Sequence, residues 1–240
     1  MATNGTNHGG TGNHLLDVLP AAEHTEILRG LTIVGLPIKR VLFEPEQAVN
    51  AVYFPLTGVV SLVTPLEEGA IVEVATVGNE GVVGVPLVTG GSLAVRAISQ
   101  VPGKALRMDA ATFLAHLEQD ARFRHVVESY TQALFGQISQ AAACNRLHSN
   151  EERLSRWLLM SHDRVGSDTF PITHEFLAQM LGARRATVTL SAGLLQAAGI
   201  IEYHRGRVTI VDRARLEEVS CECYAVIKSA LDRALASAAQ

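Results

Sequence analysis

Residues 173–190 read THEFLAQMLGARRATVTL. The hydroxyl group of Thr173 can cap a first helix over 173–181, because a threonine side chain accepts a hydrogen bond from the free N–H groups of the first turn. Gly182 permits the positive φ that a tight turn between helices often requires, and a second amphipathic helix follows over 184–198. The inner face of this second helix is expected to carry Val188, Leu190, Leu194 and Leu195. The stretch therefore predicts a helix-turn-helix.

The second helix begins with a basic and polar face. In a helix-turn-helix this end enters the major groove, where arginine can read guanine and threonine can contact a phosphate or a thymine methyl group. Two short strands are predicted over 199–203 and 207–211, and the turn between them carries Arg205, which is the pattern of a basic wing. The residues expected to contact DNA are Thr173, Arg184, Arg185, Thr187, Thr189, Arg205 and Arg207.

The chain upstream of this motif has a different pattern. One or two short helices are expected over 14–36, where apolar residues follow helical spacing. Residues 39–108 consist of short β-branched runs separated by turn signals, which is typical of a small sandwich or barrel. A short helix capped by Asp109 follows, and then a long helix from about Asp120.

The long helix carries an apolar stripe that has two interpretations. Spacing of three and four residues favours a seam between two copies of the chain. Packing of the helix against its own domain would use the same side chains. We expect the seam, with dimer contacts from Val127, Tyr130, Leu134, Ile138 and Ala141.

Composition and motifs restrict the class of protein. Of the 240 residues 48% are hydrophobic, so a sizeable core can form. The net charge of -4 is not typical of a nucleic-acid binder, but DNA binding needs only a local basic patch. No signal-peptide pattern or long apolar run is found, so we expect a cytoplasmic protein with no membrane partner. Common catalytic motifs are lacking, so we expect no enzyme.

A family resemblance rests on several segments. They are ERLSRWLL at 152–159, the two helices of 173–190, Leu195 with GII at 199–201, and GRVTI at 206–210. In this order and spacing the chain resembles regulators of the cyclic-AMP receptor protein / fumarate-nitrate regulator (Crp/Fnr) superfamily. The resemblance implies an α+β fold with a cyclic-nucleotide-binding-like β-roll, a long dimerisation helix and a C-terminal winged helix-turn-helix. It also implies a homodimer on a pseudo-palindromic operator in double-stranded DNA, with RNA polymerase as a further partner; activation and repression both fit it.

The expected division of the chain follows from these segments. It comprises a disordered tail over 1–13, a β-roll sensor domain over 14–119, a dimerisation helix over 120–147, a winged helix-turn-helix domain over 148–213 and a C-terminal helix over 214–240.

One departure from the family concerns the recognition helix. Members often carry an acidic residue directly after the arginine that corresponds to Arg185, whereas this chain has Ala186. A cytosine contact would be lost, so we expect a different target sequence. Arg184 stands where a small hydroxyl residue is common and would add a phosphate or base contact.

The ligand of the sensor domain stays open. The glycine-rich segment 78–84 resembles part of the family's cyclic-nucleotide site, but Arg96 is not followed by the serine or threonine of the phosphate-binding pair, so cyclic nucleotide is disfavoured. An iron–sulfur cluster is disfavoured because such sensors need about four cysteines and the first one here is Cys144. Haem bound through a histidine or cysteine is a further, weakly supported alternative for the sensor ligand. The candidate ligand-binding residues are Gly78, Asn79, Glu80, Gly81, Val82 and Arg96.

The three cysteines are an odd number, which argues against a disulfide framework. Cys144 and His148 share a helix face but make an incomplete metal site, so we expect packing positions and no metal. Cys221 and Cys223 are placed on the last helix, pointing apart, with redox activity as the alternative.

A second hypothesis for function stays beside DNA binding. The chain could be an effector-binding β-roll module that acts through protein contacts without specific DNA binding, and Arg184 with Arg185 discriminates between the two.

Overall fold

The computed structural model describes residues 10–67, 69–90 and 94–238, and the expected tail over 1–13 lies largely outside these ranges. Its helices are α1 (His14–Asp17), α2 (Ala21–Arg29), α3 (Pro86–Thr89), α4 (Ala110–Gln119), α5 (Ala121–Leu147), α6 (Asn150–Val165), α7 (His174–Leu181), α8 (Arg185–Ala197), α9 (Arg213–Val219) and α10 (Cys223–Ala238). Its strands are β1 (Thr32–Leu36), β2 (Val41–Phe43), β3 (Ala51–Pro65), β4 (Ile71–Val77), β5 (Arg96–Asp109), β6 (Thr169–Pro171), β7 (Ile201–His204) and β8 (Arg207–Ile210).

The N-terminal domain is an antiparallel β-roll. Its sheet has the order β1-β5-β3-β4, and β2 pairs with β5. The long strands β3 and β5 change register between Pro55 and Val60, where Gly58 has φ +84°. A Cβ atom at Gly58 would meet the carbonyl oxygen of Val101 at 2.5 Å, so only glycine permits this close approach. The bend lets one sheet curl round a single apolar core.

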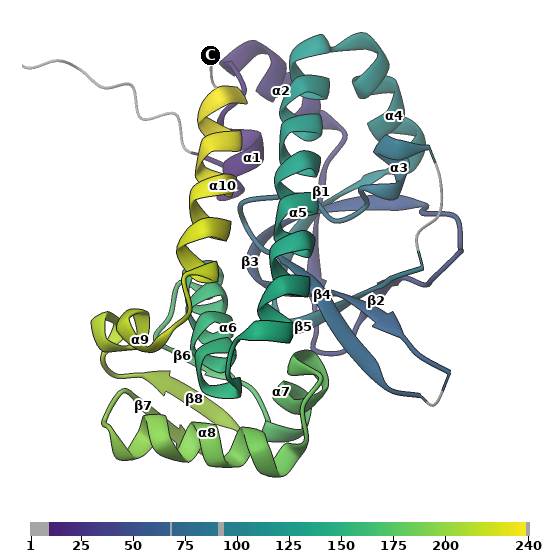
Figure 1. Ribbon diagram of the computed structural model, residues 1–240. Coiled ribbons are helices and arrows are strands. Elements are labelled where there is room, and N and C mark those ends of the chain that lie inside the picture. The colour runs from purple at the N-terminus through teal and green to yellow at the C-terminus, as the bar shows by residue number, and fades with distance from the viewer. Residues whose placement is uncertain (1–9, 68, 91–93, 239–240) are drawn as a thin grey trace, which may run out of the picture.

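The helices α4 and α5 close this core. Phe113 of α4 and Phe123 of α5 pack edge to face with ring centroids 5.7 Å apart, and Phe113 also contacts Phe54 of β3. Asp120 begins α5 because its carboxylate accepts hydrogen bonds from the N–H groups of Arg122 and Phe123. The 27-residue helix α5 then runs down the side of the roll to the second domain (Figure 1).

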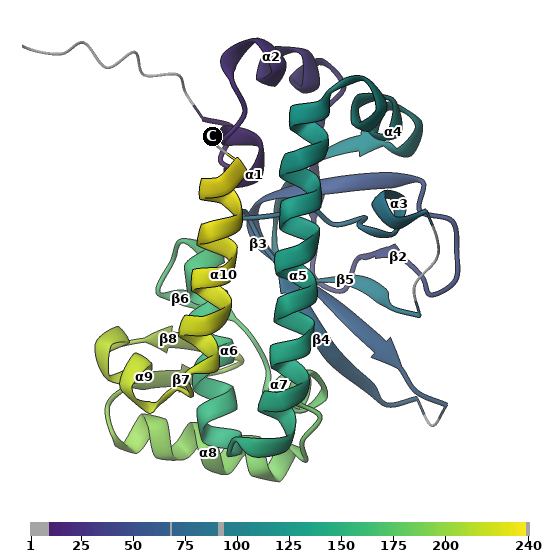
Figure 2. The ribbon, with the colours of Figure 1, turned by 45° about the horizontal axis from the view of Figure 1, so that its top comes forward.

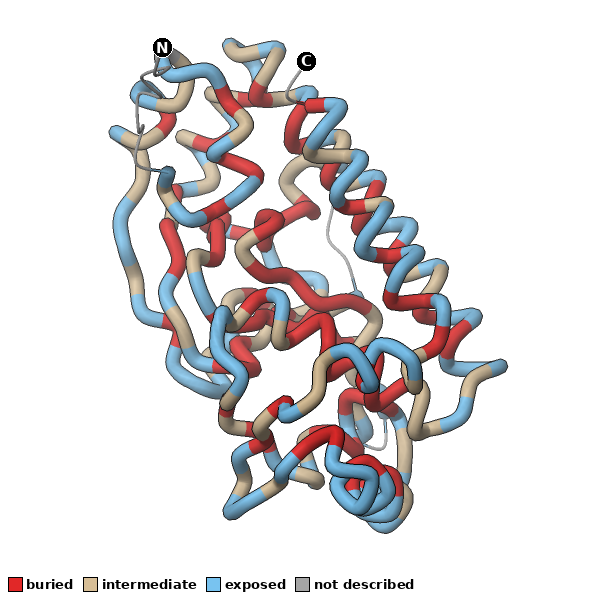
Figure 3. The backbone as a smooth tube through the Cα atoms, turned by 90° about the vertical axis from the view of Figure 1, so that its left-hand side faces the viewer, coloured by how far each residue is buried: buried red, intermediate tan, exposed pale blue. Residues whose placement is uncertain are grey.

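The second domain is a winged helix-turn-helix. Helices α6, α7 and α8 pack around Leu154, Phe170 and Leu195, and a three-stranded sheet of order β6-β8-β7 covers one side. Figure 3 shows the buried residues gathered along the strands and on the inner faces of the helices. No helix within the described residues is long and apolar enough to cross a membrane.

Three expectations about elements were wrong. The side chain of Asp109 does not cap α4, because its carboxylate accepts instead from Arg107 Nη2 at 2.8 Å. Residues 32–36 form strand β1 and not the end of a helix, because this segment pairs with the edge of β5 from Thr32 opposite Arg107. The region after 213 is two helices, α9 and α10, because Ser220 adopts an extended conformation with ψ 154° between them. Helix α10 returns along α5, and the two lie side by side in both ribbon views (Figures 1 and 2).

Part of the expected disordered tail is packed. Asn13 is fully buried, and its side-chain amide donates to the carbonyl oxygens of Pro55 at 2.8 Å and Gly81 at 3.0 Å. Its side-chain oxygen also caps α1 by accepting from the N–H group of Leu16. Asn13, which composition placed in the disordered tail, is therefore part of the packed β-roll domain.

Candidate DNA-binding site, domain contacts and sensor cavity

The helix-turn-helix is built as its sequence predicts. Thr173 Oγ1 accepts a hydrogen bond from the N–H group of Phe176 at 3.2 Å, which begins α7. Gly182 ends α7 with φ +57°, and α8 begins at Arg185. The inner face of α8 consists of Val188, Ser191, Ala192 and Leu195. The expectation that Leu190 and Leu194 lie on this face was wrong: their exposed fractions are 65% and 50%, because α8 is rotated to bury Ser191 and Ala192 against α6.

The outer face of α8 carries most of the expected contact residues. Arg184, Arg185 and Thr189 are exposed, and Thr187 is half-buried. Thr173 is exposed as well, but its hydroxyl oxygen is engaged in the cap of α7. Arg185 has only a loose partner, since its Nε lies 4.0 Å from Glu175 Oε2. The guanidinium groups of this face are therefore free to pair with phosphates or base edges.

A histidine that the sequence motif did not single out fixes the recognition helix. His174 Nδ1 lies 3.0 Å from Thr189 Oγ1, and its ring lies over Tyr203 of β7 with centroids 4.1 Å apart. The phenol group of Tyr203 donates to the carbonyl oxygen of Ile172 at 2.6 Å. Burial and the nearby charge of Arg185 lower the pKa of His174, so the ring is neutral at physiological pH. These contacts join α7, α8 and the wing.

The wing projects two cations beside α8. Strands β7 and β8 are joined by Arg205 and Gly206, which have φ +46° and +77° and so form the left-handed turn that suits the twist of a hairpin. Arg205 and Arg207 are exposed. Arginine rarely adopts a positive φ, so Arg205 is conformationally unfavourable in this turn. Its positive charge at the tip of the wing, however, suits contact with a DNA phosphate.

The two domains are joined through a buried ion pair. Arg164 of α6 donates through Nε and Nη2 to the carboxylate of Glu80, at 2.8 to 3.0 Å. Its Nη1 donates to Thr76 Oγ1 at 2.8 Å. Burial opposes ionisation of Glu80, but the charge and hydrogen bonds of Arg164 outweigh it and lower the pKa of this carboxyl group. Glu80 is thus a charged partner of the DNA-binding domain.

A second domain contact involves Glu73 of β4. Trp157 Nε1 of α6 donates to Glu73 Oε1 at 3.1 Å, and Ser61 Oγ donates to Glu73 Oε2 at 2.6 Å. Burial raises the pKa of Glu73 to about 7 and outweighs Ser61 and Arg156, which act in the opposite direction. The contact therefore contains a carboxyl group that titrates near neutral pH.

The residues expected to bind a sensor ligand are mostly engaged elsewhere. Gly78 and Gly81 lie against the side chains of Arg164 and Tyr130, so closely that a Cβ atom would overlap them. The backbone of Asn79 accepts from the N–H group of His14, and Arg96 pairs with Glu44 at 2.7 Å. Of the six expected residues, only Val82 lines the cavity between the β-roll and α5.

This cavity has a volume of about 410 Å³ and is apolar. Its walls include Phe43, Leu62, Val74, Val82, Leu134 and Phe135. No charged side chain stands among its described lining residues. A phosphate group in the cavity would therefore lose its hydration without gaining a counter-charge.

The apolar stripe of α5 faces the chain's own domain. Val127, Tyr130, Leu134 and Ala141 are buried within one chain, and Ile138 is half-buried at the cavity. Their burial accounts for the helical spacing without a second copy. The large apolar side chains that α5 leaves at the surface are Phe135, in the middle of the helix, and Leu147, its last residue, with exposed fractions of 70% and 76%.

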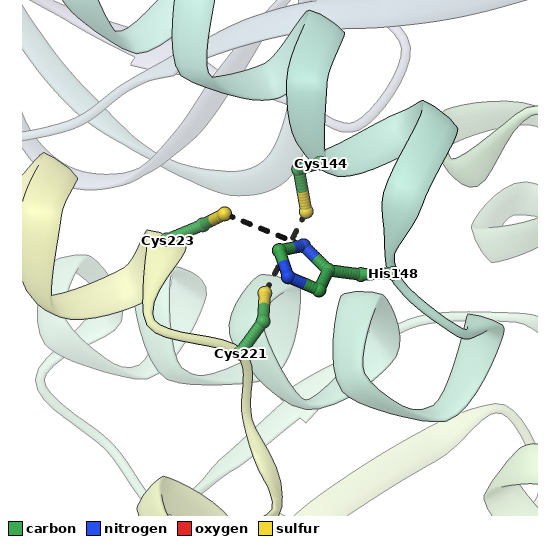
Figure 4. Close-up of side chains that lie close together, drawn as sticks. All are labelled: Cys144, His148, Cys221 and Cys223. Carbon is green, nitrogen blue, oxygen red and sulfur yellow. Dashed lines mark hydrogen bonds between the residues drawn. The ribbon is translucent and has the colours of Figure 1, made fainter.

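The cysteines form a cluster with His148. Cys221 lies in the segment before α10 and not on that helix, so Cys221 and Cys223 do not point apart as expected. Both approach Cys144, near the end of α5, and His148, which follows α5 (Figure 4). The sequence indicated only the Cys144–His148 pair of this cluster. Cys221 follows His148 by 73 positions (221 minus 148), so spacing along the chain could not link the last two cysteines to the pair.

Two family models match the chain. They are a cyclic nucleotide-binding domain over residues 34–120 and a Crp-like helix-turn-helix domain over residues 152–219. No curated protein matches the chain. The chain belongs to the Crp/Fnr superfamily of DNA-binding transcription regulators.

Solved structures show the same fold. FixK2 from Bradyrhizobium japonicum aligns with TM-score 0.68 and 16% identity, over 80% of this chain and 98% of that one. A CRP-family transcriptional regulator from Thermus thermophilus aligns with TM-score 0.65 and 18% identity, over 78% and 96%. The c-di-GMP responsive global regulator CLP of Xanthomonas campestris aligns with TM-score 0.63 and 14% identity, over 80% and 99%.

Proposed function

We propose that this regulator binds a pseudo-palindromic operator in double-stranded DNA as a homodimer, through α8 and the wing. The observation that carries the proposal is the outer face of α8, where Arg184 and Arg185 are exposed and Thr189 is held by His174. Arg205 and Arg207 of the wing extend this basic surface. A protein of net charge -4 thus places cations where a recognition helix meets the major groove.

The sensor domain is proposed to respond to something other than a cyclic nucleotide. The apolar walls of the cavity and the Glu80–Arg164 ion pair support this, because neither leaves a free cation for the phosphate. Titration calorimetry with cyclic AMP and cyclic GMP should detect no binding. Binding of either nucleotide at micromolar concentration would overturn this part of the proposal.

Arg185→Ala tests the DNA-binding part. An operator is first selected from a random DNA library with the unchanged full-length protein, and affinity is measured by fluorescence anisotropy over a series of salt concentrations. Loss of a bidentate arginine contact costs about 1–3 kcal/mol, so specific binding should weaken by about 5- to 150-fold. Arg29→Ala, which removes an exposed arginine from α2, is the matched control and should bind normally.

Two results would favour the rival effector-binding module. One is failure of the selection to enrich any sequence. The other is unchanged affinity and sequence preference in Arg185→Ala. Interaction with RNA polymerase is proposed only as a consequence of promoter binding.

A further inference from the structure

Four potential metal ligands converge where the dimerisation helix ends. Cys144 lies in the last turn of α5, and His148 follows the helix directly. Cys221 precedes α10, and Cys223 is the first residue of that helix. One ligand atom from each residue lies within 4.8 Å of all the others, and Figure 4 shows the four side chains pointing toward one centre.

Two distances between these atoms match those of a tetrahedral site. Zinc binds thiolate at about 2.3 Å and imidazole nitrogen at about 2.0–2.1 Å, so tetrahedral geometry separates two sulfur ligands by about 3.8 Å and a sulfur and a nitrogen by about 3.6 Å. Cys144 Sγ and Cys221 Sγ are 3.6 Å apart, and Cys223 Sγ and His148 Nδ1 are 3.5 Å apart. A disulfide would need about 2.05 Å. We propose that Cys144, His148, Cys221 and Cys223 bind one zinc ion.

The groups around the ligands suit a metal centre. Glu222 Oε2 lies 3.2 Å from His148 Nε2, which orients the imidazole ring and leaves Nδ1 for the metal. Gln140 Nε2 donates to Cys223 Sγ at 3.1 Å. A carboxylate behind a ligating histidine and an N–H donor to a ligating sulfur are the usual supports of such sites.

The charge of the site is also balanced. Three thiolates and one Zn²⁺ carry a net charge of about -1, which is costly to bury without a counter-charge. Arg153 and Arg156 of α6 are 8% and 7% exposed, and each interacts electrostatically with Cys144. The Nε atoms of both arginines are buried and make no hydrogen bond within the described residues. Both guanidinium groups also donate to other partners, Arg153 to the carbonyl oxygen of Leu181 and Arg156 to Met160 Sδ, and their positive charges offset part of the negative charge of the site.

The position of the site gives the ion a structural role. The helix-turn-helix domain matched over residues 152–219 lies entirely between His148 and Cys221. Zinc would join the two ends of this domain to each other and to α5. Closing a loop of this length by a metal removes conformational freedom mainly from the unfolded chain. Zinc would also hold α10 against the dimerisation helix.

Metal content is the first test. The full-length protein is purified without a metal-affinity tag and without chelator, and its metals are measured by plasma mass spectrometry. We expect ~1 zinc ion per chain. Cys223→Ser and His148→Ala should reduce the zinc content at least severalfold, whereas His125→Ala should not, because this exposed histidine of α5 is outside the cluster. Glu222→Gln should weaken zinc binding by about 10–100-fold in a chelator competition.

A second measurement avoids variants that fail to fold. Cobalt(II) is exchanged into the unchanged protein, and its absorption spectrum is recorded. Tetrahedral coordination by three thiolates should give intense d–d bands and thiolate-to-cobalt charge transfer, which disappear when zinc is added. Protein free of zinc with an octahedral cobalt spectrum would overturn the proposal. So would a Cys144–Cys221 disulfide in alkylated native protein, or iron with acid-labile sulfide.

Discussion

The carboxylate of Glu80 and the guanidinium group of Arg164 form a buried ion pair between the sensor domain and the DNA-binding domain. Glu80 belongs to the glycine-rich segment that the sequence suggested for a ligand, and Arg164 belongs to α6. The segment that would report ligand binding is thus in direct contact with the domain that binds DNA. Any effector that displaces Glu80 would act on this contact.

Arg164→Ala should destabilise the protein strongly. It leaves the Glu80 carboxylate buried without its partner, and breaking one side of a buried pair costs about 3–5 kcal/mol. Urea denaturation measures the change. Arg29→Ala, which breaks an exposed pair with Glu26, is the control and should change stability by less than about 1 kcal/mol. Equal effects of the two substitutions would refute the assigned role of the pair.

The Glu73 contact predicts a dependence on pH. Burial raises the pKa of Glu73 from 4.5 to about 7, against Ser61, Trp157, Arg156 and Arg164, which favour the anion. A raised folded-state pKa means that the contribution of Glu73 is fully present below about pH 4.5 and is lost as pH rises through about 7.

Glu73→Gln, which stays neutral, tests this sign. The variant should exceed the unchanged protein in stability at pH 8, by an amount on the order of 3 kcal/mol, and the advantage should shrink toward pH 5. Urea denaturation at both pH values measures it. An advantage that is the same at both pH values, or larger at pH 5, would contradict the prediction.

Arg205→Asn should change stability and DNA affinity in opposite directions. Asparagine tolerates the positive φ of this turn better than arginine, so the wing should gain a few tenths of a kcal/mol of stability. Removal of the charge should weaken DNA binding and reduce the salt slope by about 1. Thermal denaturation and anisotropy titrations in different salt concentrations measure the two effects. A salt slope that does not change would show that Arg205 makes no phosphate contact.

Phe135→Asp should weaken self-association. Phe135 is a large apolar side chain exposed in the middle of α5, so a charge there would be buried against the second copy in the proposed dimer. Light scattering coupled to gel filtration should report a shift toward monomer. Ile33→Asp, at the similarly exposed Ile33 of β1, should leave the mass unchanged. A dimer that persists in Phe135→Asp would place the interface elsewhere.

The sequence by itself determined the features that depend on neighbours along the chain. The cap at Thr173, the turn at Gly182 and the wing turn at Arg205 are local, because each depends on hydrogen bonds or φ angles within a few residues. The order and spacing of the motifs indicated the Crp/Fnr superfamily, which the family models confirm. The strand pattern of 39–108 predicted the N-terminal β-domain.

The tertiary structure alone decided which distant side chains meet. The spacing of the stripe with Leu134 favours a seam between two copies over packing on its own domain, and only the folded chain shows that these side chains are buried against their own β-roll. Cys144 and His148 are two ligands by sequence, and they become four because α10 returns along α5 and brings Cys221 and Cys223 beside them. Periodicity records which face of a helix is apolar, whereas the identity of its neighbour depends on the path of the whole chain.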